Sequence, residues 1–255
     1  AALVDASPLD VAIIIPTLNE AANVARLVAR LTDVLAGRAW EVIFVDEFNT
    51  DGIPDPTKWT LCPVGKSDWC NQMSESYDQA YVKDGNLVLV GEKKDGKYLA
   101  GGIKTQGLFS FAFGKVECRA KLTKYPNGAF PAIWMMPQKG PWPDAGEIDI
   151  MEHLNHDRFV YQTIHSRYAT TLKQKDPASY VTVQVNPEKY NIYGVEILPD
   201  SLVFRVNGWK TMVYPRLEEG MYAGKTQYPF GEPYYLLIDM QIGGNWVGPA
   251  SGEDL

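Results

Sequence analysis

Three acidic residues within six positions form the segment of this sequence that is best suited to chemistry. Residues 146–153 read GEIDIMEH, and Glu147 and Asp149 alternate with isoleucines. Such alternation is typical of a half-buried β-strand, so both carboxyl groups should point to one face. Strict alternation would turn Glu152 to the opposite face. A single β-bulge near Met151 would return it, and bulges are common beside active sites.

Three carboxyl groups on one patch would not all ionise near neutral pH. Like charges in close proximity disfavour one another's ionisation, so at least one pKa should rise. A carboxylate kept ionised beside a carboxylic acid kept protonated is the pair that glycoside hydrolysis needs. The residues alone leave open another interpretation, an exposed acidic strand face, with or without a cation site.

The sequence after residue 47 predicts the sheet that must position these acids. Short strand-like runs recur, with turn signals between them at 84–85, 95–96, 127–128 and 207–208. The Asn-Gly pair at 207–208 is a strong hairpin signal because both residues tolerate the backbone of a tight turn. Many short strands with Gly and Pro at the corners predict a mainly β protein, a jelly-roll β-sandwich.

The first 46 residues have a different pattern. The unbroken apolar run at 11–15 predicts a strand that is buried on both faces. Apolar residues at helical spacing predict a helix over 20–36, and 41–45 forms the next strand. We therefore expect an N-terminal β-α-β segment. The chain then divides into a β-α unit at 1–39 and the β-sandwich domain at 40–255.

Composition excludes two classes of partner. The 255 residues carry a net charge of −7, whereas nucleic-acid binders need a basic face. No run approaches the length of a membrane span, and the early apolar run lacks the basic flank of a signal peptide. The aromatic content of 12%, with 7 Trp and 14 Tyr, suits a protein that stacks sugar rings, although an aromatic core has the same composition.

The cysteines and histidines do not predict a metal site. Three cysteines match no metal-binding spacing. Cys118 lies in a strand-like stretch and should be a buried, inert thiol. Cys62 and Cys70 flank a turn-rich loop, and the sequence leaves open whether they form a disulfide. His153 and His156 supply two nitrogens without a third ligand.

At the acidic segment the chain resembles glycoside hydrolase family 16, in the branch with the pattern E-x-D-x-x-E. The resemblance covers roughly residues 40–255 and is carried by DEFNTDGIPDPTKW at 46–59, FGKVECRAKL and GAFPAIWMMP within 107–137, WPDAGEIDIMEH at 142–153, TIHS at 163–166 and GGNWVG at 243–248. It implies that Glu147 is the nucleophile and Glu152 the general acid/base. Asp149 would hydrogen-bond Glu147 and help to time its ionisation.

The resemblance also implies a set of substrate-binding residues, namely Trp134, Trp142, His165, Asn245 and Trp246. Trp142 is the better candidate for stacking on sugar, because an indole in a loop of Pro and Gly has little core to fill. Trp134 has Met and Pro neighbours and is equally compatible with a core position. His165 is also compatible with a hydrogen-bonded histidine of the core.

The function that the resemblance implies is a retaining endo-glycosidase that hydrolyses β-1,3-glucan of the laminarin type or a related β-linked polysaccharide. No redox or nucleotide cofactor follows from it, and a structural calcium ion stays open. The partner would be the polysaccharide, with neither nucleic acid nor membrane. We expect a monomer, with a swapped dimer as the rival, in a secreted or periplasmic protein.

Two features depart from the family. Residues 11–46 resemble the first β-α-β unit of family 2 glycosyltransferases, such as dolichol-phosphate mannosyltransferase. In that family a second Asp and a Gly-Ser follow the strand, whereas Glu47, Phe48 and Asn49 follow it here. No Asp-x-Asp motif is found later, so a transferase activity is unsupported. The sequence also ends at Leu255, before the family's final strand.

These departures lead to one structural expectation and two functional alternatives. The β-α-β unit should fill the sheet edge that the final strand would occupy, with 11–15 covering it. A chimera of two unrelated folds would be inactive if the sandwich were compromised. A non-catalytic glucan-binding sandwich is the other alternative, although the acid trio argues against it.

Overall fold

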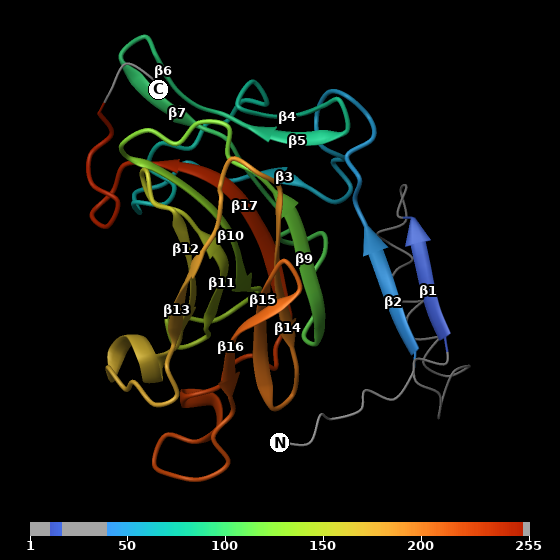
Figure 1. Ribbon diagram of the computed structural model, residues 1–255, viewed down its shortest axis with the longest axis vertical. Coiled ribbons are helices and arrows are strands. Elements are labelled where there is room, and N and C mark those ends of the chain that lie inside the picture. The colour runs from blue at the N-terminus through green and yellow to red at the C-terminus, as the bar shows by residue number, and fades with distance from the viewer. Residues whose placement is uncertain (1–10, 17–39, 252–255) are drawn as a thin grey trace.

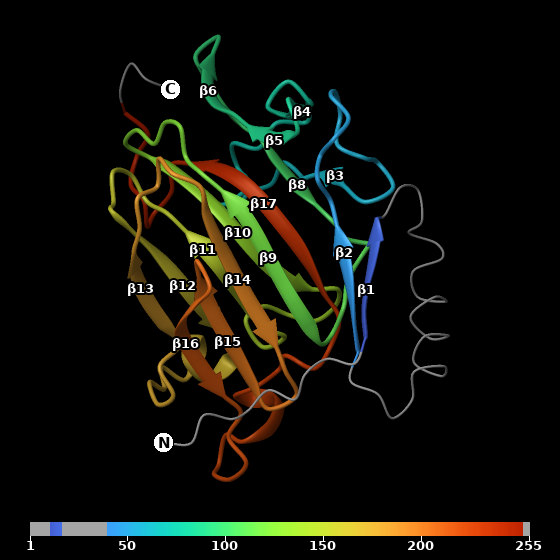
Figure 2. The same cartoon turned by 45° about the vertical axis from the view of Figure 1, so that its right-hand side comes forward.

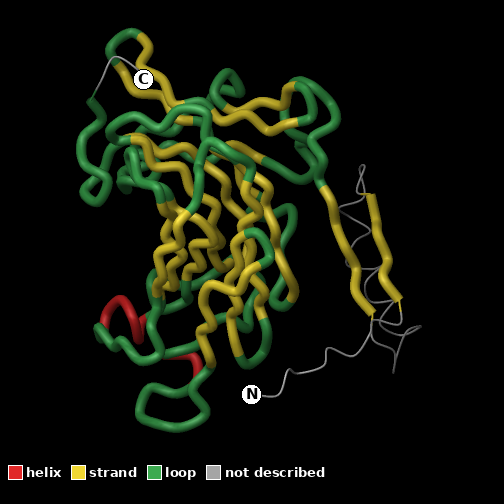
Figure 3. The backbone as a smooth tube through the Cα atoms, in the orientation of Figure 1, coloured by secondary structure: helices red, strands yellow, loops and turns green. Residues whose placement is uncertain are grey.

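The computed structural model describes residues 11–16 and 40–251, and over these ranges its regular secondary structure is almost entirely β-strand, joined by loops and turns (Figure 3). Seven strands form one antiparallel sheet, in the spatial order β13 (Tyr180–Gln184), β12 (Phe159–His165), β11 (Glu147–Glu152), β10 (Ala129–Pro137), β17 (Tyr234–Ile242), β8 (Gly102–Lys104) and β3 (Thr60–Leu61). Four strands form the second, in the order β16 (Trp209–Pro215), β15 (Ser201–Val206), β14 (Asn191–Ile197) and β9 (Gly114–Ala120). The two sheets lie face to face (Figure 2), which confirms the predicted β-sandwich.

Smaller elements complete the described part of the chain. Two hairpins pair β4 (Ala80–Lys83) with β5 (Asn86–Leu89), and β6 (Gly91–Lys94) with β7 (Lys97–Ala100). Short helical turns lie at Arg167–Thr171 and Gly224–Thr226. The predicted turn between β15 and β16 is present, with φ of 51° at Asn207 and 81° at Gly208, as a tight hairpin requires.

The facing surfaces of the two sheets form the main hydrophobic core. Ile148 and Ile150 of β11 are fully buried there, together with Val195 of β14 and Phe204 of β15. Burial of this face stabilises the sheet at about 25 cal/mol per Å² of apolar surface. It also fixes which side chains of β11 point the other way, toward the outer face of the seven-stranded sheet.

A second cluster covers half of that outer face. Over β10, β17 and β8, the side chains of Cys62, Cys70 and Met73 pack against Trp134 and Leu237. Over β12 and β13 the outer-face side chains are half-buried or exposed. The open half of the face therefore runs from β11 to β13.

All three cysteines are free thiols in the structure. Cys118 packs against the main core, and burial raises the pKa of its thiol to about 12, with the nearby Glu117 adding to the shift. The expectation of a buried thiol is met only in part, because Cys118 is half-buried, and its inertness stays a prediction. Cys62 and Cys70 are both buried, and neither is bridged.

The N-terminal strands form a sheet of their own. β1 (Val11–Pro16) pairs directly with β2 (Trp40–Val45) in parallel register, as predicted. The expectation that this unit fills the edge of the sandwich is wrong, because neither strand pairs with the two large sheets, and the pair lies beside them (Figure 1). The short strand β3 pairs with β8 and holds the sheet edge in place of β2. The helix expected over 20–36 lies outside the described residues.

Within residues 11–16 and 40–251, no helix has the length and apolar character that crossing a bilayer requires.

Candidate active site

Strand β11 carries a bulge between Asp149 and Glu152. Their partners on β12 are Thr163 and Tyr161, which are two positions apart, whereas the two acids are three positions apart. Strand β10 shows the same shift in register against β11. The bulge predicted near Met151 is confirmed.

The bulge places Glu152 on the same face as Asp149. On β10, Asp149 pairs with Trp134 and Glu152 pairs with Ala132. Trp134 and Ala132 are two positions apart and share the cluster on the outer face, and directly paired residues point to one side of a sheet. Glu147, two positions before Asp149, completes a row of three acids along the strand.

Glu152 is built to hold a proton. The side chain is buried, and this burial raises the pKa of its carboxyl to about 8, with the charge of Glu147 adding to the effect. The Thr163 hydroxyl donates to Glu152 Oε2 at 3.2 Å and partly offsets the rise. At neutral pH the group therefore carries a proton that it can donate.

Of the three acids, Glu147 is the one whose neighbours favour the ionised form. Burial raises its pKa, but His165 and two hydrogen bonds, from Trp142 and Asp149, oppose the rise. The Trp142 Nε1–H donates to Glu147 Oε2 at 2.5 Å. A carboxylate held by two donors is suited to act as a nucleophile.

Asp149 lies between the two glutamates in a deeply buried position. Only 2% of its surface is exposed, and this burial raises its pKa well above the ordinary value, with the charges of Glu152 and Glu147 adding to the effect. A protonated Asp149 can donate its hydrogen bond to Glu147, as the family resemblance implies. Donation of this kind keeps the neighbouring carboxylate ionised.

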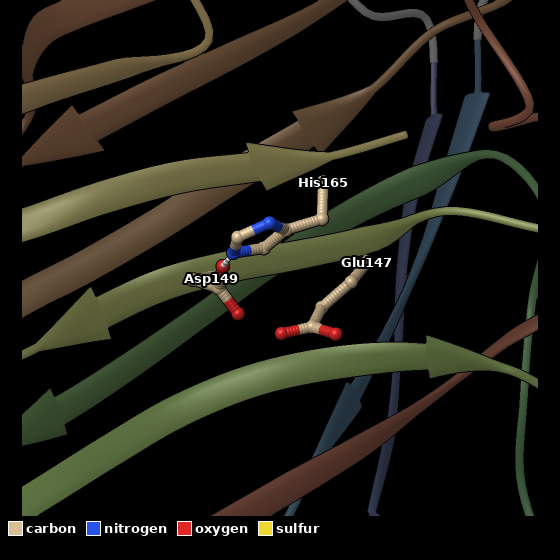
Figure 4. Close-up of side chains that lie close together, drawn as sticks. All are labelled: Glu147, Asp149 and His165. Carbon is tan, nitrogen blue, oxygen red and sulfur yellow. Dashed lines mark ion pairs between the residues drawn. The ribbon is translucent and has the colours of Figure 1, made fainter. Parts of the chain in front are cut away.

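His165 lies beside Asp149 and Glu147 (Figure 4). Its Nε2 lies 3.4 Å from Asp149 Oδ2, and its Nδ1 lies 3.1 Å from the Thr170 hydroxyl. Asp149 Oδ2 has no hydrogen-bond partner within the part of the chain that the structure describes. Ligand atoms of Glu147, Asp149 and His165 lie within 4.8 Å of one another, so these residues could also hold a cation.

The predicted binding residues differ in exposure, and two of the tryptophans are exposed near the acids. Trp142 is 55% exposed and lies beside the acids, with its ring centroid 5.8 Å from that of His165. Trp246 is also exposed, and its ring lies edge-on to Tyr161 with 4.9 Å between the ring centroids. Tyr161 pairs with Glu152 in the sheet. Contact of either indole with sugar stays a prediction.

Trp134 and Asn245 have partners within the protein. Trp134 is 6% exposed, lies 5.1 Å edge-on from Trp69 and donates its indole N–H to Asp239 at 2.9 Å. The structure thus places Trp134 in the covered half of the outer face. The backbone N–H of Asn245 donates to Asp68, which leaves its exposed side chain free for other contacts.

Sequence reasoning did not single out two polar residues of this region. Thr163 could have been found from its place two positions before His165, because alternation puts both on one face. Asp239 is fully buried under Trp134 and Gln241, and burial raises its pKa to about 7. An acid within the apolar run of 234–242 was its only signal.

Comparison with known proteins agrees with this geometry. The model of the "XgeA-like, catalytic GH16 domain" matches residues 120–193, and that of glycosyl transferase family 2 matches residues 12–58. The keratan-sulfate endo-1,4-β-galactosidase of Sphingobacterium multivorum is 36% identical over 94% of this chain and 58% of its own length. The β-glucanase of Rhodothermus marinus is 32% identical over 82% of this chain and 78% of its own length.

Solved structures show the same relationship. One, from work on endo-acting O-glycanases that prominent human gut bacteria express to initiate mucin breakdown, has a TM-score of 0.75 and 31% identity over 84% of this chain and 94% of its own. The laminarinase from Rhodothermus marinus has a TM-score of 0.72 and 29% identity over 82% of this chain and 88% of its own. The transferase-like match ends at residue 58, whereas each of these two structures matches more than four fifths of the chain. The chain belongs to glycoside hydrolase family 16.

Proposed function

We propose that the protein is a retaining endo-glycosidase that cleaves internal β-1,3 linkages of a laminarin-type glucan. The observation that carries this proposal is the bulge in β11, which brings Glu152 to the face of Glu147 and Asp149. Without the bulge the proton donor and the nucleophile would lie on opposite sides of the sheet. Retention requires the two carboxyl groups to approach to about 5–5.5 Å across the scissile bond, which a shared face allows.

The reaction proceeds in two displacements. The Glu147 carboxylate attacks the anomeric carbon, and the bond to the leaving oxygen breaks while Glu152 protonates that oxygen. The sugar is then held as an ester of Glu147. Glu152, now ionised, removes a proton from water, whose oxygen attacks the anomeric carbon and releases Glu147. Asp149 keeps its proton and its hydrogen bond to Glu147.

The polymer is a separate question from the chemistry. Relatives named as β-glucanase and laminarinase support glucan as the substrate. The 36% identity to a keratan-sulfate endo-1,4-β-galactosidase supports a second candidate, an internal β-galactoside linkage. Both candidates use the same acid pair and differ in the sugar and in the position of the linkage. Such polymers do not cross membranes, so we expect the enzyme to act outside the cytoplasm.

A panel of polymers distinguishes these candidates. We expect new reducing ends from laminarin, with products that keep the β configuration when first formed, as seen by proton NMR. Keratan sulfate, its desulfated form and mixed-linkage glucan are assayed in parallel. Release from keratan sulfate alone would transfer the proposal to the β-galactoside. Binding of a polymer without any cleavage would favour the non-catalytic glucan-binding sandwich.

The Trp142 contacts give a further prediction. Trp142→Phe keeps a ring but removes the N–H that donates to Glu147, so the pKa of Glu147 should rise and the acidic limb of the kcat/KM profile should move to higher pH. Trp142→Ala should show the same shift and also weaken substrate binding by about 1–3 kcal/mol if the indole stacks on sugar. Unchanged affinity in a folded Trp142→Ala protein would contradict the stacking role.

A further inference from the structure

The register of the large sheet aligns a tyrosine with the acid row. Asp149 pairs with Thr163 on β12, and Thr163 pairs with Tyr180 on β13. Directly paired residues point to one face, so Tyr180 lies on the same side as the acids. Two strand spacings, roughly 9.6 Å, separate β11 from β13. This distance exceeds the length of a single sugar ring, so Tyr180 is beyond the unit that reacts.

Tyr180 is not needed for the hydrophobic core. Along β13, Val181 and Val183 pack against the main core, whereas Tyr180 and Thr182 point to the outer face. The Tyr180 side chain is 62% exposed. Its hydroxyl has no hydrogen bond to any residue within the described ranges. An exposed aromatic ring on this face is therefore free to contact a ligand.

The closed half of the outer face determines the direction in which a ligand can extend. On the side of β11 away from Tyr180, Asp149 pairs with Trp134 of β10. Trp134 is 6% exposed and lies against Trp69. On the other side, Thr163 is half-buried and Tyr180 is exposed. A chain that passes over the acids across the strands thus lies over β12 and β13.

We propose that Tyr180 is a distal sugar-binding platform, which stacks on a unit of the glycan beyond those at the scissile bond. The inference rests on the proposed function, since it assigns a further part of the same cleft. The occupant is the β-linked substrate itself, because the platform is continuous with the acid row. The ring supplies a flat apolar face for the C–H face of a pyranose, and Thr182 adds a hydroxyl on the same face.

Kinetics on oligosaccharides of different length test the platform. Tyr180→Ala should lower kcat/KM about tenfold on long laminari-oligosaccharides, a loss equivalent to ~1.4 kcal/mol and within the range for stacking on an aromatic ring. The shortest oligosaccharide that is cleaved should show no change, because it does not reach β13. Tyr180→Phe keeps the ring face and should retain the parent values. Trp209→Ala, which removes an 80% exposed ring from the other sheet, is the matched control and should change neither.

Two outcomes would overturn the platform. One is an equal loss by Tyr180→Ala on short and long oligosaccharides, and the other is no loss on either. Laminarin and keratan sulfate binding to the Glu147→Gln protein, with and without Tyr180→Ala, provides a readout that does not need hydrolysis. Equal affinities there would also overturn it. A parent protein that binds a polymer but cleaves none contradicts the proposed function, while a tenfold weaker binding by Tyr180→Ala would still support the platform.

Discussion

Glu147→Gly is expected to abolish polymer hydrolysis, with a loss on the order of 10⁴-fold or more, as for covalent nucleophiles in other enzymes. In the proposed mechanism the variant lacks the carboxylate that forms the glycosyl ester, but it retains Glu152 as a base. An α-glycosyl fluoride mimics the covalent intermediate in configuration and leaving group. The variant should therefore transfer its sugar to an added acceptor, because the space left by the side chain accommodates fluoride.

Glu147→Gln is the matched control for this experiment. It removes the nucleophile as well, but its amide fills the space, so it should neither hydrolyse polymer nor use the fluoride. Glycine in a strand costs roughly 0.5–1 kcal/mol of stability, so thermal unfolding should accompany the assays. Polymer hydrolysis by folded Glu147→Gly at near the parent rate would show that another residue is the nucleophile.

The placement of the three acids on one face was predictable from the sequence largely because strand periodicity is strict. Alternation in EIDI put Glu147 and Asp149 on one face, and the position of Glu152 then required one extra residue. The structure contains this extra residue, because the register of β11 shifts against both of its neighbours. A chemical requirement thus predicted a backbone irregularity that no propensity would indicate.

Contacts across the sheet were less predictable. The partners of β11 depend on long-range register, which a single sequence does not encode locally. For this reason the row from Asp149 through Thr163 to Tyr180 became visible only in the structure. Trp134 illustrates the same limit, because its burial depends on the loop that carries Trp69.

The opening segment shows where local pattern and tertiary placement separate. The apolar run at 11–15 correctly predicted a parallel strand beside 40–45. Its placement was wrong, because filling the edge of the sandwich was inferred from a family resemblance. The two-residue strand β3 occupies that edge instead, and so short a strand leaves almost no periodic signal.

Glu152→Gln should remove both the proton donor and the alkaline limb of the pH profile. Burial raises the pKa of Glu152 to about 8, so the parent's donor is fully present below that pH and is lost as pH rises through it. The parent kcat/KM on polymer should therefore fall above about pH 8.

Loss of a general acid lowers the rate by about 10²–10⁴-fold, so Glu152→Gln should show this loss on polymer. The loss should be much smaller on an aryl glycoside, whose leaving group departs without a proton.

Thr163→Val provides the finer test, because the Thr163 hydroxyl donates to Glu152 and lowers its pKa. Its removal should move the alkaline limb to higher pH, with Glu147 still ionised and the acidic limb in place. An alkaline limb that persists in Glu152→Gln, or that ignores Thr163→Val, would assign the donated proton to another group, with Asp149 as the nearest alternative.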